Sequence, residues 1–166
     1  MLATGDLWPP SRRRTSRSLA RAAPDAAVNR WWYEQVGAAW SWSDRLVWSE
    51  QQWAAYVSRP RLQTWIAAWK DQPAGYFELD HGASETEIAY FGLLAEFIGR
   101  GLGRHLLNAA VELGWATGAK RVWVHTCTLD HPHALANYLA RGFKVYRTET
   151  YPRPAAPLPP ENLGVS

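Results

Sequence analysis

The chain has 166 residues, which is enough for one domain with a sizeable core, and its 11 tryptophans far exceed ordinary usage. Its single cysteine excludes an internal disulfide framework. No apolar run reaches membrane-spanning length, and no apolar core follows the charged residues near the start as it does in a signal peptide. We therefore expect a soluble cytoplasmic protein without a membrane partner.

The formal net charge of +3 comes from the first part of the chain, where residues 1–21 hold five arginines and one aspartate. A basic arm can touch nucleic acid or anionic lipid, but such arms are more often solvated termini. We therefore expect no nucleic-acid binding and a disordered arm at residues 1–14. The proline-rich residues 152–166 predict a C-terminal tail. Residues 15–151, between the two, are expected to form the folded domain.

Turn residues and hydrophobic periodicity divide the first half of this domain into strands and helices. The expected elements are a strand at 15–21, a helix at 24–37, a helix from Ser49 to just before Pro60, and strands at 61–69, 74–79 and 87–94. Gly37 is a residue favoured just beyond a helix C-terminus, and Ser49 followed by Gln52 is a capping box. Short turns between the last three strands imply an antiparallel meander.

The second half of the chain alternates helices with strands. We expect a helix from Leu102 to Gly118, a strand at 121–128, a helix at 132–141 and a final strand at 143–151. Strands and helices in this order predict an α/β fold in which a mixed sheet has helices on both faces.

One stretch, Glu87 to Gly114, organises the rest of the chain. It begins with an apolar run at 88–94 that leaves neither face polar, which suits a strand buried on both sides. Three glycines, at positions 99, 101 and 103, then precede a helix. The first N–H groups of a helix have no internal partner, and glycines let that backbone close around an anion. We expect the ligand of this loop to carry phosphates.

The spacing of these glycines narrows the choice of ligand. No Gly-Lys followed by Ser or Thr is present, and the last glycine of the dinucleotide pattern G-x-G-x-x-G is missing in either frame. What remains resembles the acetyl-CoA site of the GNAT N-acetyltransferases, whose pattern is Gln/Arg-x-x-Gly-x-Gly/Ala. Gly101 and Gly103 match this pattern, while Ile98 stands at the Gln/Arg position. On these residues alone, a glycine loop that merely joins strand to helix is the alternative.

A second segment resembles the same family. Residues 134–143 match the GNAT pattern A-x-x-x-Y-x-x-x-G-F. The resemblance then covers about residues 15–150 and implies the GNAT fold, a central mixed, mostly antiparallel sheet flanked by helices. It also implies an N-acetyltransferase that uses acetyl-CoA as co-substrate without a metal and acetylates a primary amine in a ternary complex. A GNAT-shaped module that binds acyl-CoA without turnover is the alternative.

The resemblance also implies which residues hold the cofactor. The central strand would bond the pantetheine arm through its backbone, the glycine loop would bind the pyrophosphate, and His131 stands where the family often has an asparagine that contacts CoA. The expected cofactor-binding residues are Phe91, Gly92, Leu93, Leu94, Gly99, Arg100, Gly101, Leu102, Gly103, Arg104 and His131. Gly92 lets a ligand approach the backbone closely. A plain core strand is compatible with the same strand residues.

Two residues are expected to move protons. Counting by two from Glu87 passes through apolar residues, so its carboxylate should be partly desolvated and its pKa raised toward that of a general base. Glu78, on the preceding strand, is the spare candidate, and a solvated Glu87 is the alternative. Tyr138 matches the family's tyrosine and is the expected general acid for the departing thiolate. Its alternative role is that of a packed tyrosine with a wetted hydroxyl.

Two further questions concern a metal and the acceptor. Five potential metal ligands lie close together in the sequence, at His125, Cys127, Asp130, His131 and His133. One helix start would scatter them, so we expect no metal site. By the resemblance, the first two helices and their tryptophan-rich loop would shape the acceptor site, where aromatic rings suit an ammonium group. The identity of this small-molecule or peptide amine, and a homodimer, are left open.

Overall fold

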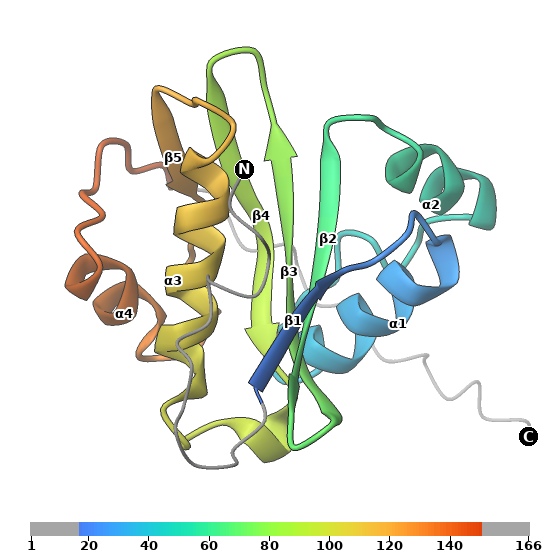
Figure 1. The fold of residues 1–166 in the computed structure, drawn as a ribbon, viewed down its shortest axis with the longest axis horizontal. Helices are drawn as coiled ribbons and strands as arrows, with labels where there is room; N and C mark the ends of the chain where they lie inside the picture. Colours follow the sequence, from blue (N-terminus) through green and yellow to red (C-terminus); the bar gives the residue numbers. More distant parts are fainter. Residues whose placement is uncertain (1–16, 151–166) are drawn as a thin grey trace, which may run out of the picture.

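The computed structural model describes residues 17–150. Its elements in chain order are β1 (Arg17–Arg21), α1 (Ala26–Gly37), α2 (Glu50–Val57), β2 (Leu62–Trp69), β3 (Gln72–His81), β4 (Glu85–Leu93), the short 3₁₀ turn η1 (Ala95–Phe97), α3 (Leu102–Trp115), β5 (Arg121–Val124) and α4 (Ala134–Ala140) (Figure 1). The expected arm at 1–14 and tail at 152–166 lie outside the described residues, so the domain boundaries stay predictions.

The five strands form one sheet in the order β1-β2-β3-β4-β5. The first four run antiparallel to their neighbours, and β5 runs parallel to β4. Helices α1 and α2 lie on one side of the sheet, and α3 lies on the other (Figure 1). The predicted mixed, mostly antiparallel α/β sheet with helices on both faces is therefore confirmed. None of the helices between residues 17 and 150 combines the length and the hydrophobicity needed to cross a bilayer.

The larger core lies between α3 and the sheet. Leu106 and Leu107 of α3 are fully buried in one cluster with Phe77 and Ile88 of the central strands. The helix lies close to the sheet because Gly114 has no side chain: a Cβ there would be 3.1 Å from both methyl groups of Val122. The apolar residues of α3 recur at helical spacing, so one face of this helix buries the whole row.

The layer formed by α1 and α2 is held by a buried polar cluster. Glu78 of β3 is fully buried, and its carboxylate accepts hydrogen bonds from Asn29 at 3.0 Å, Tyr56 at 2.5 Å and Arg45 at 3.3 Å. Asn29 also donates to the Thr64 hydroxyl at 2.8 Å. A buried charge is tolerated only where it is paired and hydrogen-bonded, so the cluster fixes both helices and the loop between them on the sheet.

Local signals at the helix starts are confirmed, but Gly37 has another role than expected. Ser49 and Gln52 form the predicted capping box, and Asp25 caps α1 by accepting from two backbone N–H groups. Gly37 is the last residue of α1 instead of a residue beyond its end. A Cβ on Gly37 would lie 2.5 Å from the Cβ of Trp42. Glycine is needed here because the loop packs closely against the helix end.

The sequence overestimated the regular structure near the C-terminus. β5 ends at Val124 instead of residue 128, and α4 is shorter than the predicted helix at 132–141. The final strand expected at 143–151 is wrong over its described part, because residues 143–150 form no strand. Val145 is 62% exposed, and Tyr146 contacts Arg121 only through its ring, which lies 4.8 Å from the guanidinium. Residues 143–150 do not pair with β5, the last strand of the sheet, and their largely exposed side chains bury too little surface to favour a strand.

A bulge in β4 changes which side chains share a face. Leu79 pairs with Ile88, but Glu78 pairs with Tyr90, so one residue of β4 is left without a partner on β3. Paired residues of antiparallel strands point to the same face. Glu87 and Tyr90 therefore lie on the face that α1 and α2 cover, because their partners on β3, Asp80 and Glu78, lie there. The prediction that the side chain of Glu87 shares one face of the strand with Phe91 and Leu93 is therefore wrong.

We predict that Gly92→Ala destabilises the protein by about 1–3 kcal/mol, because overpacking a well-packed layer costs this much. The added methyl group would lie 2.3 Å from Cγ1 of Val36, a buried residue of α1. Urea unfolding measures the change in the free energy of unfolding. In the double variant Gly92→Ala/Val36→Ala the added methyl group has room. The double variant should therefore lose less unfolding free energy than the two single variants lose together. Additive costs would contradict this packing account.

Candidate active site

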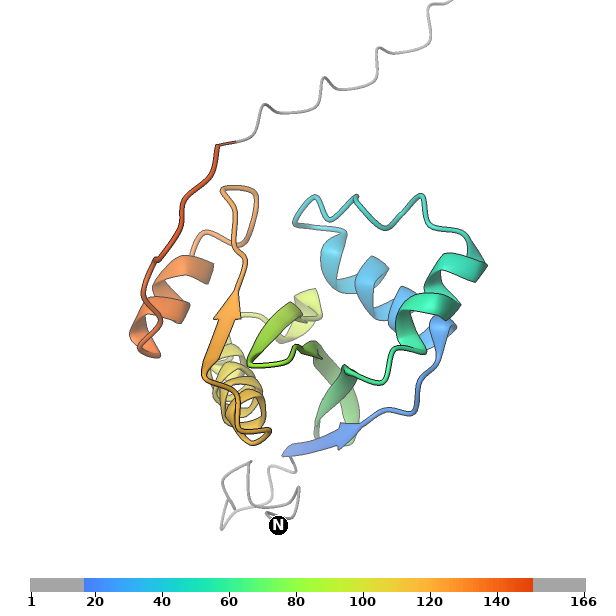
Figure 2. The ribbon, with the colours of Figure 1, turned by 90° about the horizontal axis from the view of Figure 1, so that it is seen from above.

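The parting of β4 from β5 creates the candidate site. The two strands pair only from Glu85 to Ile88 on β4, while β4 continues along β3 to Leu93. Beyond the last pair a cleft of about 790 Å³ opens. The loop after α1 and the loop after β5 lie on opposite sides of this cleft (Figure 2). The cleft therefore lies where the backbone of β4 has lost its neighbour on one side.

Four segments of the chain line this cleft. They are the end of α1 with the following loop (Val36 and residues 40–44), β4 (residues 88–93), the glycine loop (Ile98, Gly99, Gly101, Gly103 and Arg104) and the segment from β5 to α4 (residues 124–138 in part). Side chains from both faces of the sheet thus border one continuous space. A ligand on the α3 face and a ligand on the α1 face can meet in the gap between the strands.

The glycine loop has the backbone conformation of an anion site. Gly99 and Gly101 have φ values of +82° and +73°, in the left-handed region that glycine adopts easily. No heavy atom outside the chain neighbours lies within 4 Å of a Cβ placed on either residue. Gly101 precedes the first turn of α3, whose N–H groups have no internal partners. This open, positively polarised helix start can receive phosphate oxygens.

The predicted cofactor residues divide into two groups. Eight of them border the cleft: Phe91, Gly92, Leu93, Gly99, Gly101, Gly103, Arg104 and His131. The remaining residues point their side chains elsewhere. Leu94 and Leu102 pack into apolar clusters, and Arg100 stacks over the ring of Phe97 at 5.4 Å. Gly92 is also bordered by Val36, so its missing side chain serves helix packing as well as access to the cleft.

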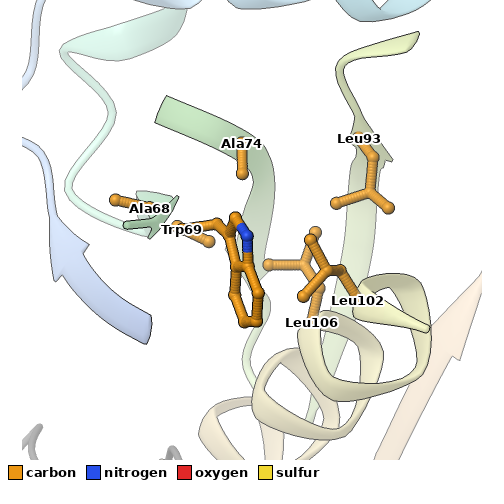
Figure 3. Close-up of a pocket in the computed structure, with 7 residues that line it drawn as sticks. Ala68, Trp69, Ala74, Leu93, Leu102 and Leu106 are labelled. Carbon is orange, nitrogen blue, oxygen red and sulfur yellow. The ribbon is translucent and has the colours of Figure 1, made fainter. Parts of the chain in front are cut away.

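A second, much smaller cavity lies beside the first turn of α3. It measures about 10 Å³ and is lined by apolar side chains that include Trp69, Leu93, Leu102 and Leu106 (Figure 3). This volume is about the minimum that one water molecule needs, and a water needs polar partners as well. The cavity is therefore a packing gap and not a ligand site.

Tyr138 lies where α4 meets the cleft. Its side chain is 7% exposed, and its ring packs against Phe91 at 6.3 Å and Phe143 at 5.7 Å between centroids. Burial, and then the negative charge of Asp130, raise the pKa of the Tyr138 hydroxyl well above its usual value. The hydroxyl therefore keeps its proton at neutral pH, and the residue borders the cleft.

The two candidate carboxylates differ in accessibility. Glu87 is half-buried, and its pKa is raised by burial and by the nearby Asp80, against the opposing effect of His125, Arg45 and Arg59. Glu87 lies just before the cleft-lining part of β4. Glu78 is 0% exposed and fully hydrogen-bonded in the polar cluster. Glu78 is therefore closed off from solvent, whereas Glu87 is partly accessible.

The histidines after β5 shape the cleft. The ring of His131 lies 4.8 Å from that of Trp40, so the two loops touch above the cleft. Nδ1 of His131 accepts a hydrogen bond from the backbone N–H of His133 at 3.0 Å. Among residues 17–150, no three histidine, cysteine or acidic side chains are grouped closely enough to hold a metal ion. The carboxylate of Asp130 instead accepts hydrogen bonds from Thr126 and the backbone of Cys127.

Sequence reasoning missed a carboxylate on the opposite wall. Asp44 borders the cleft and accepts hydrogen bonds from the hydroxyls of Tyr33 at 2.6 Å and Tyr90 at 2.7 Å. The signal was present, because Asp44 is the only acidic residue of the tryptophan-rich stretch at 38–49. Its pairing with two tyrosines that are 57 residues apart is visible only in the fold.

The family comparison agrees with this geometry. A family model described as "Acetyltransferase (GNAT) family" matches residues 26–143, which is well over half of the chain. No curated protein matches the chain at a significant level. The match contains β4, the glycine loop and α4, the three elements that border most of the cleft.

Solved structures of acetyltransferases share the fold. An aminoglycoside acetyltransferase from an uncultured soil metagenomic sample, crystallised with trehalose, has a TM-score of 0.65 and 14% identity, covering 81% of this chain and 94% of its own. An IAA acetyltransferase from Bacillus cereus has a TM-score of 0.61 and 25% identity, covering 80% and 79%. An aminoglycoside N-acetyltransferase in complex with CoA has a TM-score of 0.61 and 13% identity, covering 89% and 100%. The chain belongs to the GNAT family of acetyltransferases, and the protein is an acyltransferase.

Proposed function

We propose that the protein transfers an acetyl group from acetyl-CoA to a primary amine by direct attack within a ternary complex. The observation that carries this proposal is the cleft that joins the two faces of the sheet through the gap between β4 and β5. Two substrates that enter from opposite faces meet in this gap. No covalent enzyme intermediate is needed when both are bound together.

The α3 side of the cleft suits the cofactor. The left-handed glycines 99 and 101 and the start of α3 offer backbone N–H groups to the pyrophosphate, with Arg104 beside them. The pantetheine arm would then lie along residues 91–93 of β4, where the strand has no neighbour from β5. The similar structure solved with CoA supports this choice of carrier.

The reaction needs one proton acceptor and one proton donor. The amine nitrogen attacks the thioester carbon, so that a C–N bond forms and the C–S bond breaks. Glu87 takes the proton that the amine loses, and Tyr138 gives its proton to the departing thiolate. A backbone N–H of β4 that faces the thioester oxygen would stabilise the developing oxyanion, which is worth about 3 kcal/mol in comparable sites.

The alternative is a module that binds acyl-CoA without turnover, and two measurements separate it from the enzyme. A ligand that binds only the native protein raises its Tm, so acetyl-CoA should do so in either case. Release of the CoA thiol in the presence of a broad amine panel is expected only of the enzyme. A protein whose Tm does not respond to millimolar acetyl-CoA would contradict both.

We predict that Gly103→Val lowers acetyl-CoA affinity at least tenfold while the protein stays folded. A Cβ on Gly103 meets only Cδ1 of Leu93, at an ordinary 3.8 Å, and the residue has no left-handed φ, so folding tolerates a side chain. The branched side chain would instead occupy space that the pyrophosphate needs. Titration calorimetry measures the affinity.

Ala116→Val is the control for this variant, because it introduces the same branched side chain just beyond the other, exposed end of α3. Its acetyl-CoA affinity should equal that of the wild type. Undiminished affinity in a folded Gly103→Val protein would show that the phosphates bind elsewhere.

We predict that Glu87→Gln lowers kcat/KM by roughly 10²–10⁴-fold without weakening acetyl-CoA binding, as expected for a lost general base. Because burial and Asp80 raise the pKa of Glu87, wild-type activity should fall with decreasing pH already above the usual glutamate range. The variant should lack this acidic limb. Tyr138→Phe should slow the reaction but keep the limb, since only the acid is lost. An unchanged acidic limb in Glu87→Gln would rule this residue out as the base.

A further inference from the structure

The carboxylate of Asp44 is fixed in position but retains free hydrogen-bonding capacity. Each of its oxygens accepts one tyrosine hydroxyl, from Tyr33 on one side and Tyr90 on the other. A carboxylate has about four acceptor sites, so both oxygens can accept a further donor. The residue is exposed, and it borders the cleft. It is therefore a preorganised acceptor that faces the ligand space.

Among the described residues, no cation forms an ion pair with this carboxylate. Within residues 17–150, Asp44 takes part in none of the ion pairs. The neighbouring Arg45 turns away from the cleft, where it pairs with the buried Glu78 and stacks on the rings of Tyr56 at 3.9 Å and Tyr90 at 4.1 Å. Arg45 and Glu78 balance each other, so the wall formed by the α1–α2 loop carries one net negative charge, that of Asp44.

The carboxylates of Asp44 and Glu87 are biased in opposite directions. Partial burial raises the pKa of Asp44, but the hydroxyls of Tyr33 and Tyr90 together with Arg45 more than offset this, and the pKa lies below its usual value. The pKa of Glu87 is raised. Asp44 therefore stays ionised at pH values at which Glu87 can still bind a proton. This difference suits Asp44 to binding a charge and Glu87 to proton transfer.

Aromatic rings complete the wall around Asp44. Trp40 and Trp42 border the cleft in the same loop, and the ring of Trp42 lies 4.8 Å from that of Tyr90 and 5.6 Å from that of Tyr33. The face of a tryptophan ring attracts a cation, and this attraction adds to that of a nearby carboxylate. Both features select a positive group.

We propose that Asp44, Trp40 and Trp42 bind a second, non-reacting cationic group of the acceptor, so that the preferred acceptors are small amines with two or more positive charges. This inference rests on the proposed acetyl transfer and specifies its substrate class. Because the pKa of Asp44 lies below its usual value, its carboxylate is a weak proton acceptor, so the site suits a cation that keeps its proton and does not react.

The register of the sheet sets the spacing between the backbone positions of Glu87 and Tyr90, whose hydroxyl binds Asp44. Glu87 pairs with Asp80 and Tyr90 pairs with Glu78, so their partners are two positions apart on β3. This corresponds to about 7 Å along the strand. A short diamine such as putrescine can place one nitrogen near Glu87 and the other near the carboxylate that Tyr90 holds.

The test compares acceptors of equal length that differ in the far charge. With the full-length protein and acetyl-CoA, kcat/KM is measured for putrescine, 4-aminobutanol and butylamine. We expect putrescine to be acetylated at least tenfold more efficiently than either monoamine. Asp44→Asn should bring this ratio close to one. Glu34→Gln removes a charge from the outer surface of α1, where Glu34 pairs with Arg30, and should keep the wild-type ratio.

Each outcome decides the proposal. Equal efficiency with putrescine and 4-aminobutanol in the wild type would overturn the second-cation site and leave acetyl transfer intact. If no amine causes release of the CoA thiol, the proposed primary-amine acceptor is wrong. Calorimetric titration of putrescine into the CoA-bound protein then tests the second-cation site directly. Unchanged putrescine affinity in Asp44→Asn would overturn it, whereas a loss confined to this variant supports it. The Tm of each variant verifies that it is folded.

Discussion

The hydrogen bonds to the buried carboxylate of Glu78 are the interactions on which the layer formed by α1 and α2 depends. An unpaired buried charge costs several kcal/mol, so the fold must bring donors to it. They come from three segments: Asn29 from α1, Tyr56 from α2, and Arg45 from the loop between these helices. Because Arg45 is drawn inward to the sheet, its neighbour Asp44 is left at the cleft. A structural ion pair thus determines where a ligand-facing charge lies.

A second constraint comes from the irregularity of β4. The bulge near Ala89 turns Glu87 toward the same face as Tyr90, while Ile88 and Phe91 stay in the α3 core. The strand then loses β5 as a neighbour after Ile88, which opens the sheet between its two faces. Bulges of this kind re-aim side chains next to functional sites. One strand therefore contributes the candidate base, the backbone beside the cofactor path and a wall of the acceptor side.

The features that the sequence predicted are those that few neighbouring residues determine. The capping box at Ser49 needs only Gln52, and the glycine loop before α3 is contained in five positions. The face of Glu87 was mispredicted because a bulge depends on the register against β3 and interrupts the two-residue period. The surroundings of Glu78 were not predictable, since its donors lie between 22 and 49 residues away in the chain. The strand expected after Gly142 was wrong because residues 143–150 are largely exposed and do not pair with β5.

The two ends of the cleft have opposite electrostatic character, and this polarity orders the substrates. Backbone N–H groups and Arg104 make the glycine-loop end attractive to phosphate, whereas the ionised Asp44 makes the opposite wall repel it. For the substrates that we propose, a polyanionic cofactor and a cationic acceptor, this polarity favours different faces and disfavours either in the other's place. The gap between β4 and β5 is where they meet, with a carboxyl group that burial biases toward accepting a proton on one side and a protonated tyrosine on the other. In the proposed reaction, this charge separation along one cleft gives each substrate its own side of the parted sheet.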